Sequence, residues 1–297
     1  DMKRAYIVLN PVSGTDDPQD VRELITQYFD AQDWAHEIYT TTGEEQVADV
    51  VRKALKQDFD LCVAAGGDGT VAGVASGLVH SQVPLGIVPS GTGNALAREL
   101  KIPMQQSLAL EIITGSHTLR SFDALQVQER FFFLNLSLGV SAQAMLDAER
   151  QVKRKFGVFA YVWSGLKRLV GFQPYKFELD IDGQTYRFRA SEIVVVNSAI
   201  VGLPALRIAP DVRFDDGRFN VCIVRANTLW DYLKIGWDML LGHQKRNPHL
   251  RFLEAKHSVS IRVTHPVPIQ ADGEFIGRGS IDVSLVPQAV QIIAPTE

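Results

Sequence analysis

The sequence predicts a two-domain protein in which an α/β domain with a parallel sheet precedes a mostly antiparallel β domain. The chain has 297 residues, which suggests about two domains at roughly 150 residues each. Short apolar runs alternate with helical patterns up to about residue 100, which is typical of a parallel sheet with crossover helices. After about residue 125, segments rich in Val, Ile, Phe and Thr are separated by turns such as Asp182-Gly183 and Asp216-Gly217. That pattern favours an antiparallel β domain.

The first half alternates strands and helices in a regular order. Residues 4–9 form an apolar run that Asn10-Pro11 ends, so they predict a buried strand followed by a loop. Val21, Leu24, Ile25 and Phe29 recur at helical spacing. The expected strands are 4–9, 36–40, 60–65 and 84–89, and the expected helices are 18–32, 43–57, 71–78 and a last one ending at residue 100.

The second half contains six strand-rich segments and two helical stretches. We expect strands within 124–140, 175–198, 207–225, 258–265, 267–271 and 280–293, and helices near 143–170 and 228–242. We place the domain boundary between residues 125 and 126, which gives domains at 1–125 and 126–297.

Composition excludes several classes of protein. With 46% hydrophobic and 22% charged residues, the chain is too apolar for a disordered protein and too charged for an integral membrane protein. A formal net charge of −4 argues against a protein that coats nucleic acid. Cys62 and Cys222 cannot build a disulfide framework and are expected to be buried thiols. No run reaches the roughly 18 apolar residues that a membrane helix needs. Because the cysteines build no disulfide framework, we expect a cytoplasmic protein.

Three loops that follow predicted strands carry glycine and small polar residues. They are Asn10 to Gly14, Gly66 to Thr70 and Ser90 to Asn94. Glycines let the backbone approach a phosphate, and a helix start offers amides and a positive dipole end to an anion. Asp68 suggests a magnesium ligand or a base that activates a hydroxyl. Each loop alone also fits an ordinary turn, but three at one edge of a sheet predict a polyphosphate site. The motifs of P-loop NTPases and protein kinases are absent.

The order of four motifs resembles the diacylglycerol kinase catalytic family, and especially its soluble bacterial lipid kinases of the YegS type. The motifs are Asn10-Pro-Val-Ser-Gly14, Gly66-Gly-Asp-Gly-Thr70, Pro89-Ser-Gly-Thr-Gly-Asn94 and Asp272-Gly-Glu274. The resemblance covers nearly the whole chain. It implies an NAD-kinase-like α/β domain that binds ATP, followed by a β-sandwich domain that binds lipid. It further implies magnesium as cofactor and ATP as phosphoryl donor.

The resemblance also implies which residues surround the nucleotide. Thr41 matches a family contact to within one position, because Thr40 and Thr42 flank it, and these threonines equally suit a strand end or turn. The complete implied set is Asn10, Pro11, Val12, Ser13, Gly14, Thr41, Gly66, Gly67, Asp68, Gly69, Thr70, Val71, Ala72, Gly73, Thr92 and Asn94.

Asp272 and Glu274 are candidate catalytic carboxylates. Residues i and i+2 of an extended segment face the same way, so the two side chains would point together. Phosphoryl transfer needs charge neutralisation and a base for the substrate hydroxyl proton. In the family that this chain resembles, the glutamate is commonly the proton acceptor and the aspartate a metal or water ligand. The alternative is a hairpin turn with solvated acids.

A second acidic segment, Arg213-Phe-Asp-Asp-Gly-Arg218, reads as a hairpin turn. The resemblance makes it a structural magnesium site, with a carboxylate from Asp216 and backbone carbonyls from Arg213 and Arg218. Mixed shells of carboxylate and carbonyl oxygens suit hard cations.

Residues 150–172 interleave basic and aromatic side chains, which suits the surface of an anionic bilayer. A core-packing helix with a basic solvated face fits equally well. We therefore keep open a peripheral position at the inner face of the membrane, and a homodimer is one option for the oligomeric state.

The sequence thus predicts an ATP- and Mg²⁺-dependent kinase that phosphorylates a lipid hydroxyl, with diacylglycerol as the favoured substrate. Sphingoid kinases usually carry an acid near residues 139–143, where this chain has the neutral Gln143. The alternatives are a kinase of sphingoid or other lipids, an NAD-kinase-like small-molecule kinase, and a non-catalytic nucleotide- or lipid-binding regulator. No recognised nucleic-acid-binding motif is present.

Overall fold

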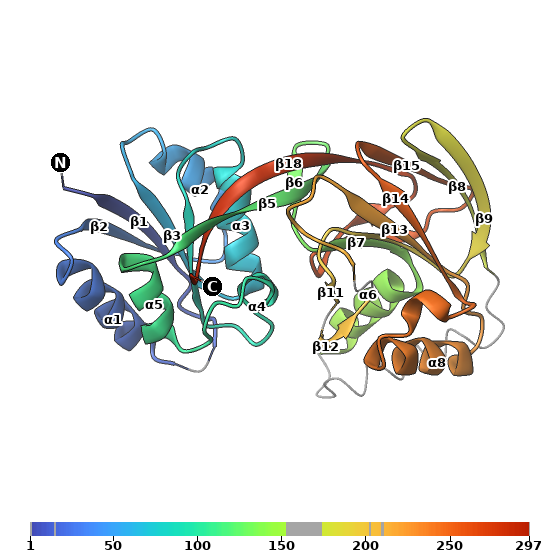
Figure 1. Ribbon diagram of the computed structural model, residues 1–297, viewed down its shortest axis with the longest axis horizontal. Coiled ribbons are helices and arrows are strands. Elements are labelled where there is room, and N and C mark those ends of the chain that lie inside the picture. Colours follow the sequence, from blue (N-terminus) through green and yellow to red (C-terminus); the bar gives the residue numbers. More distant parts are fainter. Residues whose placement is uncertain (1, 15, 153–173, 202, 209–210, 297) are drawn as a thin grey trace. The chain divides into compact units, whose positions relative to one another are not determined.

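The computed structural model describes residues 2–296 except 15, 153–173, 202 and 209–210 (Figure 1). The chain divides into two compact units. The first unit comprises Asp1–Ala124, Gly202–Pro204 and Pro287–Glu297, and the second comprises Leu125–Val201 and Ala205–Val286. The division falls inside two strands, β5 (Thr118–Val127) and β18 (Ile281–Ala294), so each of them supplies residues to both units.

The first unit is built on a parallel sheet with the order β2-β1-β3-β4-β18. Its strands are β1 (Arg4–Leu9), β2 (Ala35–Thr40), β3 (Leu61–Gly66), β4 (Leu85–Pro89) and the end of β18, where Ile292 pairs with Leu85. All six residues of β3 are buried, as expected for a central strand with helices on both faces.

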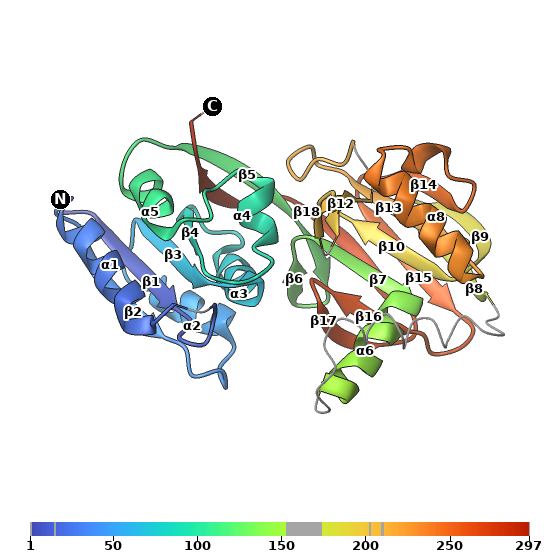
Figure 2. The ribbon, with the colours of Figure 1, turned by 90° about the horizontal axis from the view of Figure 1, so that it is seen from below.

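Helices cover both faces of this sheet (Figure 2). Helices α1 (Pro18–Asp30) and α5 (Gln106–Thr114) pack on one face, through side chains such as Phe29 and Leu110. Helices α2 (Val47–Ala54) and α3 (Asp68–Leu78) pack against each other on the other face. The short helix α4 (Ala95–Glu99) follows the β4 loop. Helix α1 begins where Asp17 caps the amide of Gln19 and proline occupies the first turn.

The second unit packs two antiparallel layers face to face. One layer is a six-stranded sheet with the order β14-β13-β10-β7-β16-β17, and the other contains β15, β8 and β9 beside the first part of β18. Leu136 and Ile193 from the first layer share a buried core with Phe177 and Ile261 from the second. The strands are β7 (Asn135–Gly139), β8 (Tyr175–Ile181), β9 (Gln184–Ala190), β10 (Glu192–Val196), β13 (Phe219–Val224), β14 (Leu250–Ala255), β15 (Ser258–Val263), β16 (Pro268–Ala271) and β17 (Glu274–Arg278).

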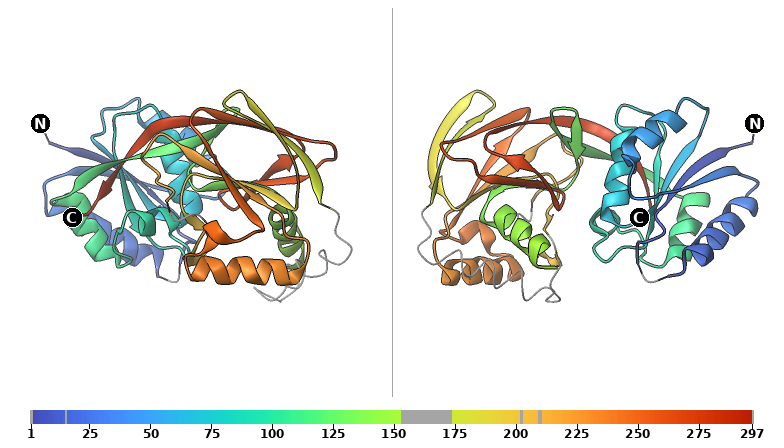
Figure 3. Two further views of the ribbon diagram at one scale, coloured as in Figure 1. Left: turned by 45° about the vertical axis from the view of Figure 1, so that its right-hand side comes forward. Right: turned by 180° about the vertical axis from the view of Figure 1, so that it is seen from behind.

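Helices α6 (Val140–Val152) and α8 (Leu229–Leu240) lie on the outer face of the six-stranded sheet (Figure 3). The side chains beneath α8 form a separate apolar cluster that includes Val194, Cys222 and Ile235. The smaller elements are β6 (Arg130–Phe132), β11 (Ile200–Val201), β12 (Leu203–Arg207) and the 3-10 helix η1 (Gln244–Arg246).

The observed architecture confirms the predicted α/β domain and antiparallel β domain. The chain division at 124/125 lies one residue from the expected boundary, but residues 287–297, which we had placed in the second domain, group with the first unit. Both cysteines are buried and free, as expected. Among the described residues, no helix is long and apolar enough to span a bilayer.

Candidate functional site

The three predicted loops contact one another at the carboxyl ends of β1, β3 and β4 in the first unit. The Asn10 Nδ2 donates to the Thr70 Oγ1 at 3.0 Å, which joins the first loop to the second. The hydroxyls of Ser13 and Ser90 lie 2.5 Å apart, which joins the first loop to the third. The expectation that these loops gather at one edge of the sheet is therefore confirmed.

Two close backbone approaches hold this three-loop cluster together. Gly14 has a φ of +81°, and a Cβ there would lie 2.2 Å from the carbonyl oxygen of Ser90. A Cβ on Gly91 would lie 2.6 Å from the Cα of Gly67. These positions accept glycine alone without rearrangement, because any side chain would push the loops apart.

The start of α3 suits a phosphate group. Its N-cap is Gly67, and no side chain of a capping residue accepts a hydrogen bond from its first amides. A Cβ on Gly69 would meet nothing within 4 Å, so the backbone is open to a ligand at this point. Amides and the helix dipole together favour an anion here.

Asp68 fastens the third loop to the second. Its two carboxylate oxygens accept the backbone amides of Asn94 at 2.8 Å and Ala95 at 2.6 Å. A Cβ on Gly93 would lie only 2.3 Å from its Oδ2. This loop-fastening contact differs from the role we expected for Asp68 as a magnesium ligand or base, which stays a prediction.

The predicted nucleotide residues differ in their exposure. Val12, Gly14, Gly69 and Thr92 are exposed, whereas Asn10, Pro11, Ser13, Gly67, Asp68, Ala72 and Gly73 are half-buried, and Thr41, Gly66, Thr70, Val71 and Asn94 are buried. A Cβ on Gly73 would lie 2.9 Å from that of Val47, so this glycine permits the packing of α3 on α2. Asn94 closes its own loop through contacts of its side chain with the backbone of Gly91. For Gly73 and Asn94, the structure gives packing and loop-closing roles that the sequence pattern does not reveal.

Arg98 is a further residue of this region that the motifs do not indicate. Its Nε donates to the carbonyl oxygen of Gly93 at 2.8 Å. It lines a cavity of about 490 Å³ together with Ser90, Gly91 and Asn94. An arginine beside the three-loop cluster offers a cation to a polyphosphate. In the sequence, a role of Arg98 is indicated solely by its position four residues after Asn94 of the Gly-Thr-Gly-Asn motif.

In the second unit, Asp272 and Gly273 form the turn of the β16–β17 hairpin. Ala271 pairs with Glu274, and the φ angles of Asp272 and Gly273 are +49° and +84°. Two consecutive positive φ angles are typical of a type I′ turn. The expected extended segment, in which Asp272 and Glu274 point the same way, is therefore wrong, because alternation does not continue through such a turn.

The Asp272 carboxylate accepts three consecutive backbone amides at the start of β7. The donors are Phe133 at 2.6 Å, Leu134 at 2.9 Å and Asn135 at 3.0 Å. The same arrangement occurs at the β8–β9 hairpin, where Asp182 accepts the amides of residues 256 to 258. Those three hydrogen bonds outweigh burial, which acts in the opposite direction, and lower the pKa of Asp182. Asp272 thus fastens its hairpin to a neighbouring segment, as Asp182 does.

Glu274 has a different partner from Asp272. Its carboxylate forms an ion pair with the Arg130 guanidinium at 2.7 Å, and its side chain is 65% exposed. An exposed carboxylate is able to exchange protons with a ligand or with solvent. The two predicted catalytic acids therefore lie at adjacent positions of one hairpin but in separate hydrogen-bond environments.

A buried carboxyl group, Glu192, is the main residue of this unit that the sequence did not predict. It begins β10 directly opposite Gly139 of β7 and accepts a hydrogen bond from the Ser141 hydroxyl. Burial raises its pKa from 4.5 to about 7, although its hydroxyl partners act in the opposite direction. The sequence signal is a single acid in the apolar run after Ala190.

A line of polar side chains connects Glu192 to the start of β7. The Ser141 and Ser137 hydroxyls lie 2.9 Å apart, and Gln270 donates to Ser137 at 2.9 Å and to the Asn135 side chain at 3.2 Å. Asn135 in turn supplies one of the amides bound by Asp272. We expected no acid near residues 139–143 because Gln143 is neutral, but the fold brings Glu192 to this position from a distant part of the sequence.

The predicted magnesium turn is a compact loop before β13. The Asp216 Oδ1 accepts the amide of Arg218 at 3.1 Å, and Asp215 pairs with Arg213 at 3.1 Å. Partial burial raises the pKa of Asp216, against the effects of the Arg218 amide and of both arginine charges. A carboxylate beside turn carbonyls is a donor set that fits a hard cation. In the described part of the chain, no three His, Cys, Asp or Glu side chains gather as a metal site.

The predicted membrane-contact stretch, 150–172, lies almost entirely outside the described residues. Its contact with a bilayer stays a prediction.

Two family models together match almost the whole chain. Residues 4–127 match the diacylglycerol kinase catalytic domain, and residues 135–294 match the YegS C-terminal NAD kinase beta sandwich-like domain. A diacylglycerol kinase of Bacillus subtilis is 26% identical over 298 residues, which cover 100% of this chain and 98% of that protein. An uncharacterised Synechocystis protein, sll0036, is 27% identical over 310 residues, 99% of this chain and 71% of that protein.

The fold agrees with solved structures of similar proteins. A diacylglycerol kinase from Bacillus anthracis superposes with a TM-score of 0.79 at 23% identity, covering 98% of this chain and 96% of that one. A second structure, of a Bacillus anthracis protein described as a putative diacylglycerol kinase, gives a TM-score of 0.78 at 22% identity, with 98% and 96% covered. With one family model on each unit, the chain belongs to the diacylglycerol kinase catalytic-domain family, as a member that carries the YegS-type C-terminal domain.

Proposed function

We propose that this protein is an ATP- and Mg²⁺-dependent lipid kinase that phosphorylates the free hydroxyl of diacylglycerol. The observation that carries the proposal is the three-loop cluster, which combines an uncapped helix start with a glycine open to a ligand. Membership of the family, whose curated relatives include proteins named diacylglycerol kinase, supports a kinase with a lipid acceptor.

In this proposal, the first unit binds the phosphates of ATP. The amides at the start of α3 are the donors that the loops present to an anion. Arg98 adds a positive charge beside the same loops. Together these groups would hold the triphosphate and neutralise part of its charge.

In this proposal, the second unit supplies the base that accepts the proton of the lipid hydroxyl. In the proposed reaction, the lipid hydroxyl oxygen bonds to the γ-phosphorus, the bond from that phosphorus to the β–γ bridging oxygen breaks, and ADP leaves. The hydroxyl proton passes to the Glu274 carboxylate, which is exposed and thus accessible to a substrate. Asp272 is assigned a positioning role, because its carboxylate holds the hairpin that presents Glu274. When bound, Mg²⁺ neutralises phosphate charge, and Asp216 with the carbonyls of Arg213 and Arg218 would hold a structural ion.

A sphingoid base is a second candidate substrate, and one observation favours it. Glu192 places a carboxyl group beside Ser141, at the position where the neutral Gln143 argues for a glycerolipid. A carboxylate would suit a cationic amine. Burial favours the neutral form of Glu192 and so favours an uncharged hydroxyl as its partner. For this reason, diacylglycerol stays the first choice.

The test is a phosphorylation assay with Mg·ATP and mixed micelles that contain diacylglycerol, a sphingoid base or no lipid, beside a parallel assay with NAD. We expect transfer to diacylglycerol, and transfer to NAD alone would overturn the proposal in favour of a small-molecule kinase. Glu274→Gln should lower kcat at least about a hundredfold, as expected for loss of a general base. Glu178→Gln is the matched control, because Glu178 is also an exposed glutamate that pairs with an arginine.

The role of Asp272 has its own control. Asp182→Asn removes a carboxylate with the same three-amide arrangement in a hairpin that has no proposed catalytic role. If Asp272→Asn and Asp182→Asn lower the stability equally but only the former lowers kcat, the positioning role holds. Equal activity of the two variants would remove it.

A further inference from the structure

Helix α8 carries an exposed apolar surface. We call it the α8 face, and it consists of Leu229, Trp230, Leu233, Trp237, Leu240 and Leu241. The two tryptophans are the most exposed of these, at 77% and 63%. In the described part of the second unit, every exposed large hydrophobic side chain belongs to the α8 face. At 3.6 residues per turn, they span an arc of about 120° on one side of the helix.

The α8 face is not the side by which the helix packs on the domain. Ile235 is buried on the opposite side, where Tyr232 and Met239 contact the apolar cluster over the six-stranded sheet. The helix therefore has apolar side chains on two sides, one covered by the sheet and one bare. A helix that packs against the protein on one side alone normally has a polar outer face. The exposed apolar α8 face therefore indicates contact with a second apolar environment.

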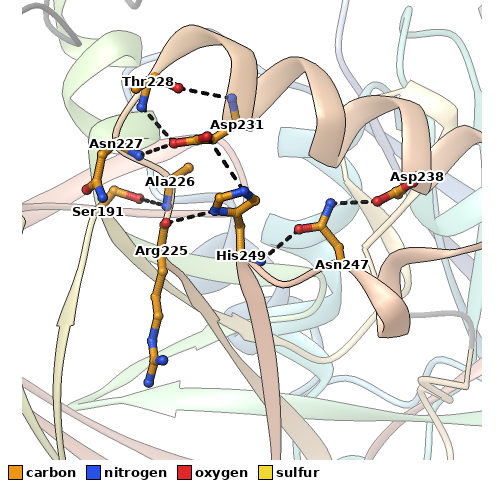
Figure 4. Close-up of polar contacts among 9 residues, drawn as sticks. All are labelled: Ser191, Arg225, Ala226, Asn227, Thr228, Asp231, Asp238, Asn247 and His249. Atoms are coloured by element: carbon orange, nitrogen blue, oxygen red, sulfur yellow. Dashed lines mark hydrogen bonds and ion pairs between the residues drawn. The ribbon is translucent and has the colours of Figure 1, made fainter.

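The acids of α8 are turned to the protein by specific contacts (Figure 4). Asp231 accepts the amides of Asn227 and Thr228 at the start of the helix and lies 3.5 Å from the His249 Nε2. Asp238 accepts a hydrogen bond from the Asn247 side chain at 2.7 Å. Neither carboxylate belongs to the arc of the α8 face, so no negative charge interrupts that surface.

The charges that border the α8 face are positive. Lys234 is exposed and lies beside the edge of the α8 face on the helix surface. From Met239 to Leu253 the sequence contains no Asp or Glu, and the segment includes Lys245, Arg246 and Arg251. Lys245 forms an ion pair with Asp211, whereas Lys234 and Arg246 are exposed. Such a border is complementary to an anionic surface.

We propose that the α8 face docks on an anionic lipid bilayer, with α8 lying in the plane of the interface. Tryptophan prefers the level of the lipid headgroups, leucine the acyl region beneath, and flanking Lys and Arg the anionic headgroups. The charge of Lys234 favours a bilayer over a second copy of this chain, because two copies of the face would bring their Lys234 side chains together. The inference is independent of the proposed kinase activity, since docking requires neither ATP nor an acceptor lipid.

The test measures binding to vesicles of phosphatidylcholine with and without phosphatidylglycerol, by co-sedimentation and by tryptophan fluorescence. We expect the protein to bind the anionic vesicles with a blue shift of its emission. Leu233→Ser should weaken binding about tenfold, from the loss of one buried leucine. The double variant Lys234→Gln/Arg246→Gln should weaken binding to anionic vesicles about thirtyfold and leave binding to neutral vesicles unchanged.

Leu108→Ser is the matched control, because Leu108 is also an exposed helical leucine, 41% exposed, but lies on α5 of the first unit. This variant should bind like the unmodified protein, and thermal melts of all variants should coincide because the substituted side chains are exposed. Equal vesicle binding by Leu233→Ser and Leu108→Ser would overturn the proposal. It would also be overturned if sedimentation velocity showed a dimer that Leu233→Ser alone dissociates and that does not bind vesicles. Loss of docking with kinase activity intact in detergent micelles would separate this surface from the proposed reaction.

Discussion

Replacing Glu192 by glutamine should make the second unit more stable at neutral and alkaline pH. Glu192 is buried at the start of β10, and burial raises its pKa in the folded protein to about 7 from the ordinary value of 4.5. Between these two values the folded protein holds a proton that the unfolded chain has released. The stability therefore falls as the pH rises from about 4.5 to about 7 and stays low above it.

The size of this effect follows from the pKa difference. At roughly 1.4 kcal/mol per pKa unit, a rise from 4.5 to about 7 amounts to about 3 kcal/mol of lost stability above pH 7. Glutamine is nearly isosteric with glutamate, keeps an acceptor for the Ser141 hydroxyl and carries no ionisable group. The variant should match the unmodified protein near pH 4.5 and exceed it by up to about 3 kcal/mol at pH 8.

The assay is urea unfolding from pH 4.5 to pH 8, with hydrogen exchange of β10 peptides to report on the second unit by itself. Glu254→Gln is the control, since Glu254 is a half-exposed acid on β14 paired with Arg218. Its curve should run parallel to that of the unmodified protein. If the Glu192→Gln curve also runs parallel, Glu192 is charged and solvated in the folded protein, and burial does not raise its pKa.

Four further substitutions test the packing of glycines and a turn. Under the proposed function, Gly14→Ala should weaken ATP binding, because its Cβ would lie 2.2 Å from the Ser90 carbonyl oxygen and push two loops of the three-loop cluster apart. Titration calorimetry with ATP measures this. Gly73→Ala should destabilise the first unit by about 1–3 kcal/mol through a clash between α3 and α2. Gly236→Ala, in open space on α8, should stabilise by about 0.5–1 kcal/mol instead, and urea titrations compare the two. Asp182→Asn should cost about 0.5–1.5 kcal/mol at pH 7, since it removes the carboxylate oxygen that accepts the Lys256 amide in an exposed turn. Because the pKa of Asp182 is lowered, its contribution is lost as the pH falls, so the deficit of the variant should shrink in acid unfolding curves.

The architecture of the first unit could be predicted almost completely from the sequence, for a physical reason. Strands β1, β3 and β4 of its parallel sheet are almost entirely buried, and each is one apolar run that ends at a loop with glycine. Helix α5 was not predicted, because its apolar residues at 109, 110 and 113 follow a start without a capping residue or proline. Strand β14 was not predicted either, because Arg251 and Glu254 give it a charged outer edge.

The candidate site shows where sequence reasoning stops. Asp182-Gly183 and Asp272-Gly273 carry the same turn signal, yet a turn is only the alternative prediction for the second, because it adjoins Glu274 and suggests paired carboxylates. Both are turns with the same φ signs, so the local signal was right in both places. Glu192 could not be found in this way, because its proximity to Ser141 depends on the register between β10 and β7.

The last strand has a consequence for how the chain is made. Residues 287–294 of β18 complete the sheet of the first unit beside β4, although some two hundred residues of sequence separate the two strands. During synthesis, the three loops at the ends of β1, β3 and β4 are thus translated long before the sheet that positions them can close. A ribosome that stalls before residue 287 would release a chain with an unpaired β4 edge, which is a template for aggregation. Newly made first units should therefore depend on chaperones until the whole second unit has emerged.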